Sequence, residues 1–469
     1  MPMVSLLPGA PVLDLGSVDL ARSGYVREEW LISGRARSWV TSGRPTPDGR
    51  WTARPAEEAD YRTRLVVVRP VDPAAASGTV LLEWLNVSGG LDVPTDWFYV
   101  HRHLLRSGAT WVGVSAQRAG ISGGGLKEGR HLTVADPDRY HSLSHPGDAY
   151  AYDIFSQAAA SLRAGDQGPL AGVPVSTVLA VGESQSAIYL TTYANAIDPH
   201  DRLVDGFLLH GRGARGAWVD GTLWDTRRLV TENLGRLAAL SGHRIREDVR
   251  VPVITVQSET DVALLGSSLA RQPDSDRFRL WEIAGAAHFD TYGLRAGRVD
   301  DGSLTPQGLH QELRPTTDPR GYRAPRPVNS GPQQHYVLQA AVDHLERWAT
   351  GGAPPPEAAR LSRPFVPVGL ARDEWGVARG GVRTPWVDVP AAVLSGLGQP
   401  VAGFGILFGT TKALPARALA RRYPGGRRDF EKQFDAATDR AVGAGFLLAE
   451  DAEEISALGR CGWPTGDRS

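Results

Sequence analysis

The sequence predicts an α/β fold, in which a mostly parallel central sheet carries helices on both faces. Between residues 61 and 283, short apolar runs typical of buried strands alternate with stretches of helical periodicity. The 54 glycines and 33 prolines require many ordered turns around such a scaffold. With 469 residues, the chain is also long enough to bury a large core.

The composition argues against several classes of protein. The 51 basic and 52 acidic residues leave a net charge of -1, whereas a nucleic-acid-binding protein normally has a basic excess. Cys461 is the single cysteine, so neither an intramolecular disulfide nor a cysteine-based zinc site is expected. The N-terminal residues lack the pattern of a signal peptide, and no long apolar run occurs, so we expect a soluble, cytoplasmic protein without a membrane span.

The alternation of apolar and amphipathic segments predicts the order of the elements. Predicted strands span 61–70, 78–85, 109–114, 175–181, 203–209, 251–256 and 278–283, and predicted helices span 96–106, 148–162 and 184–196. A long glycine-rich loop over residues 116–147 follows the third strand. This order is typical of parallel strands joined by crossover helices.

We interpret residues 1–469 as one domain with two additions. Residues 210–250 exceed an ordinary strand-to-helix loop and include a helical stretch over 231–240, so we interpret them as a lid insertion. Residues 352–469 are interpreted as a helical C-terminal extension packed on the same domain. The helices predicted in the C-terminal third span 334–350, 428–442 and 451–458.

The strongest chemical signal is the segment Gly-Glu-Ser-Gln-Ser-Ala over residues 182–187. It follows an apolar strand and opens a helical pattern, which is the context of a nucleophile elbow. Such a turn projects the hydroxyl of Ser184 above the sheet edge, and small neighbours let the helix pack close to the strand. Ser186 replaces the second glycine of the usual motif, which is an exchange of one small residue for another. The sequence therefore predicts Ser184 as the nucleophile.

A carboxylate and a histidine follow at the ends of later predicted strands. Asp261 and Glu259 both come just after the strand at 251–256, and we prefer Asp261 as the acid of a triad, with Glu259 as the alternative. His288 lies in a loop of small residues after the strand at 278–283 and is the candidate general base. The order serine, acid, histidine is the order that such a fold requires.

A triad of this kind also needs two N–H donors for the oxyanion of the tetrahedral intermediate. The backbone N–H of Gln185 is the first candidate, because it follows the nucleophile. The second donor should come from the turn after the strand at 78–85, where Asn86, Val87 and Ser88 are candidates and Val87 is the first choice. Glu83, inside that apolar strand, is expected to be buried and structural, and if it is ionised it needs a partner such as an arginine.

Several blocks resemble a known family. They are Glu-Trp-Leu-Asn-Val-Ser-Gly-Gly at 83–90, Trp-Val-Gly-Val-Ser-Ala-Gln at 111–117, Asp-Pro-Asp-Arg-Tyr at 136–140, His-Pro-Gly-Asp-Ala-Tyr at 145–150, Gly-Glu-Ser-Gln-Ser-Ala at 182–187 and Gly-Gly-Val-Arg-Thr-Pro at 380–385. With these blocks the chain resembles the bacterial and fungal α/β-hydrolase domain family over nearly its whole length. The resemblance implies an α/β-hydrolase fold in one integrated domain and says little about the substrate.

Other motifs point to no cofactor. His141, His145 and Asp148 have metal-ligand spacing but lie in a stretch broken by proline and glycine, so no metal site is expected. The glycines at 120–125 and the segment at 409–412 lack the spacing of nucleotide-binding loops.

The sequence thus predicts a serine hydrolase that acts on a small-molecule carboxylic ester through an acyl-enzyme intermediate. Acyl transfer by the same acyl-enzyme is an alternative, and so is a non-catalytic binding protein on a hydrolase fold. The sequence leaves the oligomeric state open.

Overall fold

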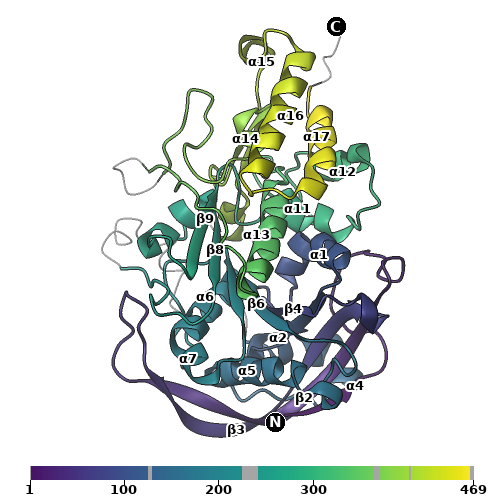
Figure 1. The fold of residues 1–469 in the computed structure, drawn as a ribbon, viewed down its shortest axis with the longest axis vertical. Helices are drawn as coiled ribbons and strands as arrows, with labels where there is room; N and C mark the ends of the chain where they lie inside the picture. The colour runs from purple at the N-terminus through teal and green to yellow at the C-terminus, as the bar shows by residue number, and fades with distance from the viewer. Residues whose placement is uncertain (1, 125–128, 224–240, 364–368, 401–402, 465–469) are drawn as a thin grey trace.

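A computed structural model describes residues 2–124, 129–223, 241–363, 369–400 and 403–464. Within these residues, nine strands form one sheet in the order β1-β2-β3-β5-β4-β6-β7-β8-β9 (Figure 1). The six neighbouring strands β5, β4, β6, β7, β8 and β9 run parallel to one another. The strands β1, β2 and β3 at the other edge pair in antiparallel fashion. The predicted fold class, a mostly parallel sheet with helices, is confirmed.

The parallel strands coincide with the predicted ones to within a few residues. They are β4 (Thr79–Trp84), β5 (Thr110–Val114), β6 (Thr177–Glu183), β7 (Gly206–His210), β8 (Val253–Ser258) and β9 (Phe278–Ile283). Each of their residues is buried, which explains why they appear in the sequence as apolar runs rather than as alternating patterns. Their carboxyl ends share one edge of the sheet, where the candidate site residues gather.

The antiparallel edge is longer than the sequence suggested. β1 (Met3–Leu6) pairs with β2 (Tyr25–Thr41), which pairs along most of its length with β3 (Ala53–Pro70). The prediction at residues 61–70 captured only the apolar end of β3. β2 escaped prediction because charged side chains interrupt its apolar alternation, and one of them, Glu29, is fully buried through ion pairs with Arg64 and Arg139.

Helices cover both faces of the sheet (Figure 1). On one face, α1 (Thr95–Ser107) and α13 (Gln333–Ala349) pack against alternate strand residues such as Leu81 and Leu179. On the other face, α5 (Ala151–Leu162) and α6 (Gln185–Thr192) pack against the intervening ones. The core is therefore divided into two clusters because successive side chains of each strand point to opposite faces of the sheet.

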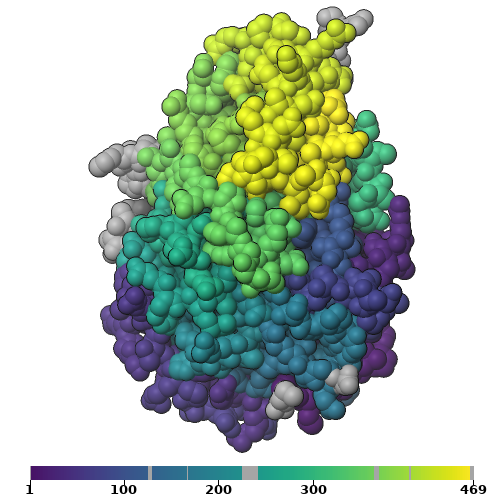
Figure 2. Space-filling model, in the orientation of Figure 1, coloured from purple at the N-terminus to yellow at the C-terminus, as the bar shows by residue number. Residues whose placement is uncertain are grey.

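The C-terminal helices α15 (Ala416–Arg422), α16 (Arg427–Gly443) and α17 (Ala452–Cys461) lie at the end of the molecule opposite the β2–β3 ribbon (Figures 1 and 2). Apolar residues of these three helices belong to the same cluster as α1 and α13. A small sheet of β10 (Ala392–Ser395) and β11 (Thr410–Ala413) precedes them. Among the described residues, the other α-helices are α2 (Arg118–Ser122), α3 (Leu132–Ala135), α4 (Pro137–Tyr140), α7 (Asp198–Asp201), α10 (Glu259–Ala263), α11 (Thr291–Leu294), α12 (Pro306–Glu312) and α14 (Pro385–Asp388).

Three expected segments differ from the structure or extend beyond the described residues. The described part of the loop expected at 116–147 contains the short helices α2, α3 and α4. The helix expected at 184–196 changes into a π-helical turn at Tyr193–Ile197. Of the expected lid, residues 224–240 lie outside the described residues, including the helical stretch at 231–240. In the described ranges, no helix has the length and apolar character needed to cross a membrane.

Candidate active site

Ser184 occupies the turn between β6 and α6 in a strained backbone conformation. Its φ of 56° and ψ of -113° lie outside the regions that residues other than glycine favour. The Ser184 N–H donates to the carbonyl of His210 at 2.8 Å, which fixes the turn to the end of β7. A Cβ atom at Gly182 would lie 2.8 Å from the Cβ of Ser186, so the close approach of strand and helix requires glycine there. This is the geometry expected of a nucleophile elbow.

His288 contacts both Ser184 and Asp261. Its Nε2 lies 2.9 Å from the Oγ of Ser184, and its Nδ1 lies 2.6 Å from Oδ1 of Asp261. The imidazole is 1% exposed and the Asp261 carboxylate is 1% exposed, so water screens the contact between them little. The three residues come from the carboxyl ends of β6, β8 and β9, as the sequence predicted.

Local hydrogen bonds orient the Asp261 carboxylate. Its Oδ2 accepts from the backbone N–H of Ser258 at 2.6 Å and from the Ser258 hydroxyl at 2.8 Å, which forms a capping box at the start of α10. Its Oδ1 remains directed at His288. The backbone N–H of His288 donates to the hydroxyl of Thr260 at 3.1 Å, so the histidine loop and the α10 turn hold each other in place.

Glu259, the alternative acid, has other partners. Its Oε1 accepts from the N–H of Gly285 at 2.8 Å, and its Oε2 accepts from Gly396 N–H, the Ser395 hydroxyl and Arg372. These contacts tie the C-terminal segment after β10 to the turn that carries Asp261. The structure therefore brings Asp261 to His288 and directs Glu259 away from it.

Two backbone N–H groups, one in the turn after β4 and one directly after Ser184, have no acceptor among the described residues. The N–H of Asn86 donates to Val93, and the N–H of Ser88 donates to the side chain of Asn86 at 2.8 Å. Among the described residues, the N–H groups of Val87 and Gln185 have no acceptor. The Ser88 hydroxyl donates to Oε1 of Gln185 at 3.0 Å, which joins the two segments. Val87 and Gln185 are thus available as oxyanion donors, while Asn86 and Ser88 shape the turn.

Buried carboxyl groups lie beneath the triad, and sequence reasoning did not place them there. Glu183 is fully buried, and its Oε1 lies 3.1 Å from Nε2 of His288. Burial and the neighbouring Asp96, Asp261 and Glu83 carboxylates raise the pKa of Glu183 well above its usual range. The signal that could have revealed this residue is a glutamate at the end of the apolar run Val-Leu-Ala-Val-Gly over residues 178–182.

Glu83 is also fully buried, and its partners differ from the expected arginine. Its carboxylate accepts from the backbone N–H groups of Asp96 and Trp97 at the start of α1, and from the indole N–H of Trp111 at 2.8 Å. Burial, followed by the Asp96 charge, raises the pKa of Glu83 well above its usual range. A helix N-terminus thus supplies the donors that an arginine was expected to provide.

The C-terminal part of the chain also reaches the site. The ring of Phe289 packs edge-on against His288 with ring centroids 5.3 Å apart. The Phe289 N–H donates to the carbonyl of Leu407, and both side chains pack on an apolar cluster that includes Val328 and Phe408. The surface beside His288 is therefore apolar on one side and is built partly by the C-terminal extension.

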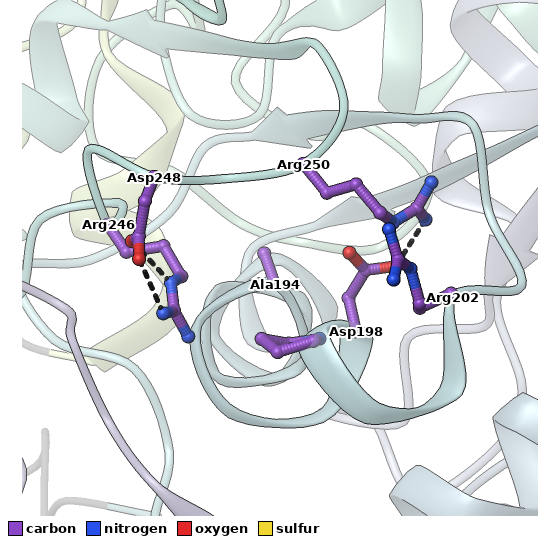
Figure 3. A pocket seen from close by; sticks show the side chains of 7 residues that line it. Ala194, Asp198, Arg202, Arg246, Asp248 and Arg250 are labelled. Carbon is purple, nitrogen blue, oxygen red and sulfur yellow. Dashed lines mark hydrogen bonds and ion pairs between the residues drawn. The ribbon is translucent and has the colours of Figure 1, made fainter.

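A separate pocket lies at the end of the helical segment after α6 (Figure 3). Arg246 pairs there with Asp248, and Arg250 pairs with Asp198 at 2.8 Å. None of the triad residues lines this pocket. In the part of the chain that the structure describes, no group of three metal-binding side chains comes together. The imidazoles of His141 and His145 instead contact backbone carbonyls.

Fold and site together define an α/β protein whose serine, aspartate and histidine meet at the carboxyl edge of a parallel sheet. The model of a family described as "Alpha/beta hydrolase domain" matches residues 4–457, and the chain belongs to this family. The match confirms the resemblance seen in the sequence blocks and identifies the protein as a member of a hydrolase family. No curated protein matches the chain.

Several solved structures are similar to this chain at low identity. A structure from a study of two fungal esterases of Rhizomucor miehei has 13% identity and a TM-score of 0.32, with 73% of this chain and 93% of that chain covered. A thermostable esterase from Pseudomonas putida has 14% identity and a TM-score of 0.30, with 70% and 86% covered. A serine hydrolase without lid from Xanthomonas campestris has 15% identity and a TM-score of 0.27, with 53% and 83% covered.

Proposed function

We propose that the protein is a serine hydrolase that cleaves a small-molecule carboxylic ester through an acyl-enzyme intermediate. The observation that carries this proposal is the continuous contact from Asp261 through His288 to Ser184, with distances of 2.6 Å and 2.9 Å, at a strained elbow. A serine hydroxyl is a weak nucleophile until a base removes its proton, and Nε2 lies within reach of that proton.

In the proposed reaction, His288 takes the proton from Ser184 as Oγ attacks the ester carbonyl. Asp261 accepts the Nδ1–H hydrogen bond, which fixes the tautomer and stabilises the imidazolium. The N–H groups of Gln185 and Val87 stabilise the oxyanion, and removal of one such donor typically costs about 10²–10³ in rate. His288 then gives its proton to the leaving alcohol, and water removes the acyl group by the same steps.

An ester is favoured over an amide because an alkoxide is a much better leaving group than the far more basic amide anion, so an ester needs less help from the general acid. The apolar wall formed by Phe289 and its neighbours suits an uncharged acyl or alcohol group. The proposed chemistry uses only groups of the chain and water, and no step calls for a cofactor.

Steady-state and burst kinetics with a panel of 4-nitrophenyl esters test the proposal. We expect a burst of about one nitrophenol per active chain with at least one ester, followed by slower turnover, and no burst with Ser184→Ala. An added alcohol that captures the acyl group faster than water does would favour acyl transfer. No turnover of any ester by the folded protein would favour the binding-protein alternative.

A further inference from the structure

Glu183 lies between the proposed base and the proposed oxyanion loop. Its side chain is fully buried, and its Oε1 is 3.1 Å from Nε2 of His288, the same nitrogen that lies 2.9 Å from Oγ of Ser184. No hydrogen-bond partner satisfies Oε1 within the described residues. A buried carboxyl oxygen without a partner is costly, so its position beside the reacting nitrogen calls for an explanation.

The other side of Glu183 holds the loop after β4. The side-chain amide of Asn86 donates to Oε2 of Glu183 and to the Glu183 carbonyl, both at 3.1 Å. The side-chain oxygen Oδ1 of Asn86 accepts from the backbone N–H of Ser88 at 2.8 Å. Asn86 and Ser88 flank Val87, so these contacts determine the direction in which the Val87 N–H points.

The charged groups that face Glu183 are mainly acidic. They are Glu83 on β4, Asp96 on α1 and Asp261 on α10, whose charges together with burial raise the pKa of Glu183 well above its usual range. His288 faces it from the loop after β9, and His210 on β7 is engaged by Asp96 at 2.9 Å. Glu183 in turn raises the pKa of Tyr99 on α1, although burial and Asp290 contribute more. Burial among acidic neighbours favours the protonated, uncharged form of this carboxyl group.

We propose that Glu183 is a positioning residue with two roles. Through its hydrogen bonds with Asn86 it fixes the direction of the Val87 N–H, and it accepts a hydrogen bond from the Nε2–H of His288 after the serine proton has moved to Nε2. This inference rests on the proposed function. The proton passes from Ser184 to Nε2 and then to the leaving alcohol, and Glu183 neither gains nor loses one. An uncharged carboxyl suits this role, because a carboxylate would form an ion pair with the imidazolium and oppose release of the proton.

The test measures the rate at which a fluorophosphonate probe modifies Ser184, from about pH 5 to pH 9, which requires no knowledge of the substrate. Glu183→Leu removes both sets of contacts and should slow labelling by about 10²-fold. Glu183→Gln mimics the uncharged carboxyl and should restore the rate to within about threefold of wild type. The midpoint of the acid limb should be the same in Glu183→Gln and in wild type.

Two results would overturn the proposal. Labelling of folded Glu183→Leu within about threefold of wild type would show that the positioning contacts are dispensable. A midpoint in Glu183→Gln that falls by about one pH unit or more would show that Glu183 acts as a charged carboxylate. Glu57→Leu, the same exchange at an exposed glutamate on β3, controls for the change in composition.

Asn86→Ala keeps the test decisive if Glu183→Leu does not fold. It should slow labelling by about tenfold or more, because the Val87 N–H loses its direction while Ser184 and His288 keep their contact. Rates close to wild type would contradict the proposal. Failure of the proposed function is a separate outcome, because the wild-type protein would then remain unlabelled.

Discussion

Exchange of Asp261 for asparagine tests the assignment of the acid. The carboxylate accepts the Nδ1–H of His288 at 2.6 Å and two hydrogen bonds from Ser258. An asparagine can still accept from Ser258 through its carbonyl oxygen, but it then presents N–H groups to Nδ1. Two donors cannot face each other, so the imidazole shifts to the tautomer with a proton on Nε2, which faces Ser184.

The size of the expected effect follows from this change of tautomer. A base that already carries a proton on Nε2 cannot accept one from Ser184, and loss of about 10⁴-fold in kcat is typical when a triad aspartate becomes asparagine. That factor corresponds to about 5.5 kcal/mol of transition-state stabilisation. Folding should change less, because the Ser258 contacts survive.

The matched control is Glu259→Gln. This residue lies two positions away on the same helix, and its oxygens accept from Gly285, Gly396, Ser395 and Arg372. We expect it to lower the free energy of unfolding by about 2–4 kcal/mol, because an amide replaces a carboxylate among buried donors. Labelling rates of Ser184 and urea unfolding of both variants provide the comparison. A loss of about 10⁴-fold in Glu259→Gln together with a nearly unaffected Asp261→Asn would refute the reasoning.

Two further predictions concern stability. Burial raises the pKa of Asp290 to about 7, so the unfolded chain releases this proton at lower pH than the folded protein does, and stability should fall as pH rises from about 4 to 7. The Asp290→Asn variant should lack this pH-dependent contribution, which is at most about 4 kcal/mol. Urea unfolding at several pH values measures it, and the same dependence of the free energy of unfolding on pH in both proteins would disprove the prediction. Arg64→Met should cost about 3–5 kcal/mol, because it leaves Glu29 and Asp92 buried without their shared cation. A cost below about 1 kcal/mol in the same assay would rule out this role for the ion pairs.

The sequence predicted the sheet edge well because the buried parallel strands are mostly apolar, with few polar residues such as Glu83 and Glu183. Ser184, Asp261 and His288 each follow such a run, and parallel topology brings the ends of these runs together. The local sequence is therefore enough to predict that a residue lies at the carboxyl end of a strand. The family match added the hydrolase class but not the roles of individual residues, which remain proposals.

The choice between Asp261 and Glu259 could not be read from local sequence. Two residues separated by two positions on a helix point in nearly opposite directions, and either direction fits a strand-to-helix turn. The deciding contacts come from Ser395 and Gly396, more than a hundred residues later in the chain. The same applies to Asn86, Val87 and Ser88, because the direction of each N–H depends on how the turn folds.

Long-range pairing also explains the features that the sequence did not reveal. Glu29 interrupts the apolar pattern of β2, yet it is buried because Arg64 and Arg139 neutralise it from β3 and from α4. Glu183 lies beside His288, although more than a hundred positions separate the two in the chain. A strand can bury a charged side chain only when a partner neutralises it. For these residues the partner is distant in the sequence, so only the folded structure shows it.

Intact-mass measurement after exposure to a fluorophosphonate probe tests the central claim that Ser184 is an activated nucleophile. The account predicts one adduct on the wild-type protein and none on Ser184→Ala under the same conditions. Circular dichroism and thermal unfolding establish that both proteins are folded. An unmodified wild-type protein, or an adduct that persists on Ser184→Ala, would contradict the account.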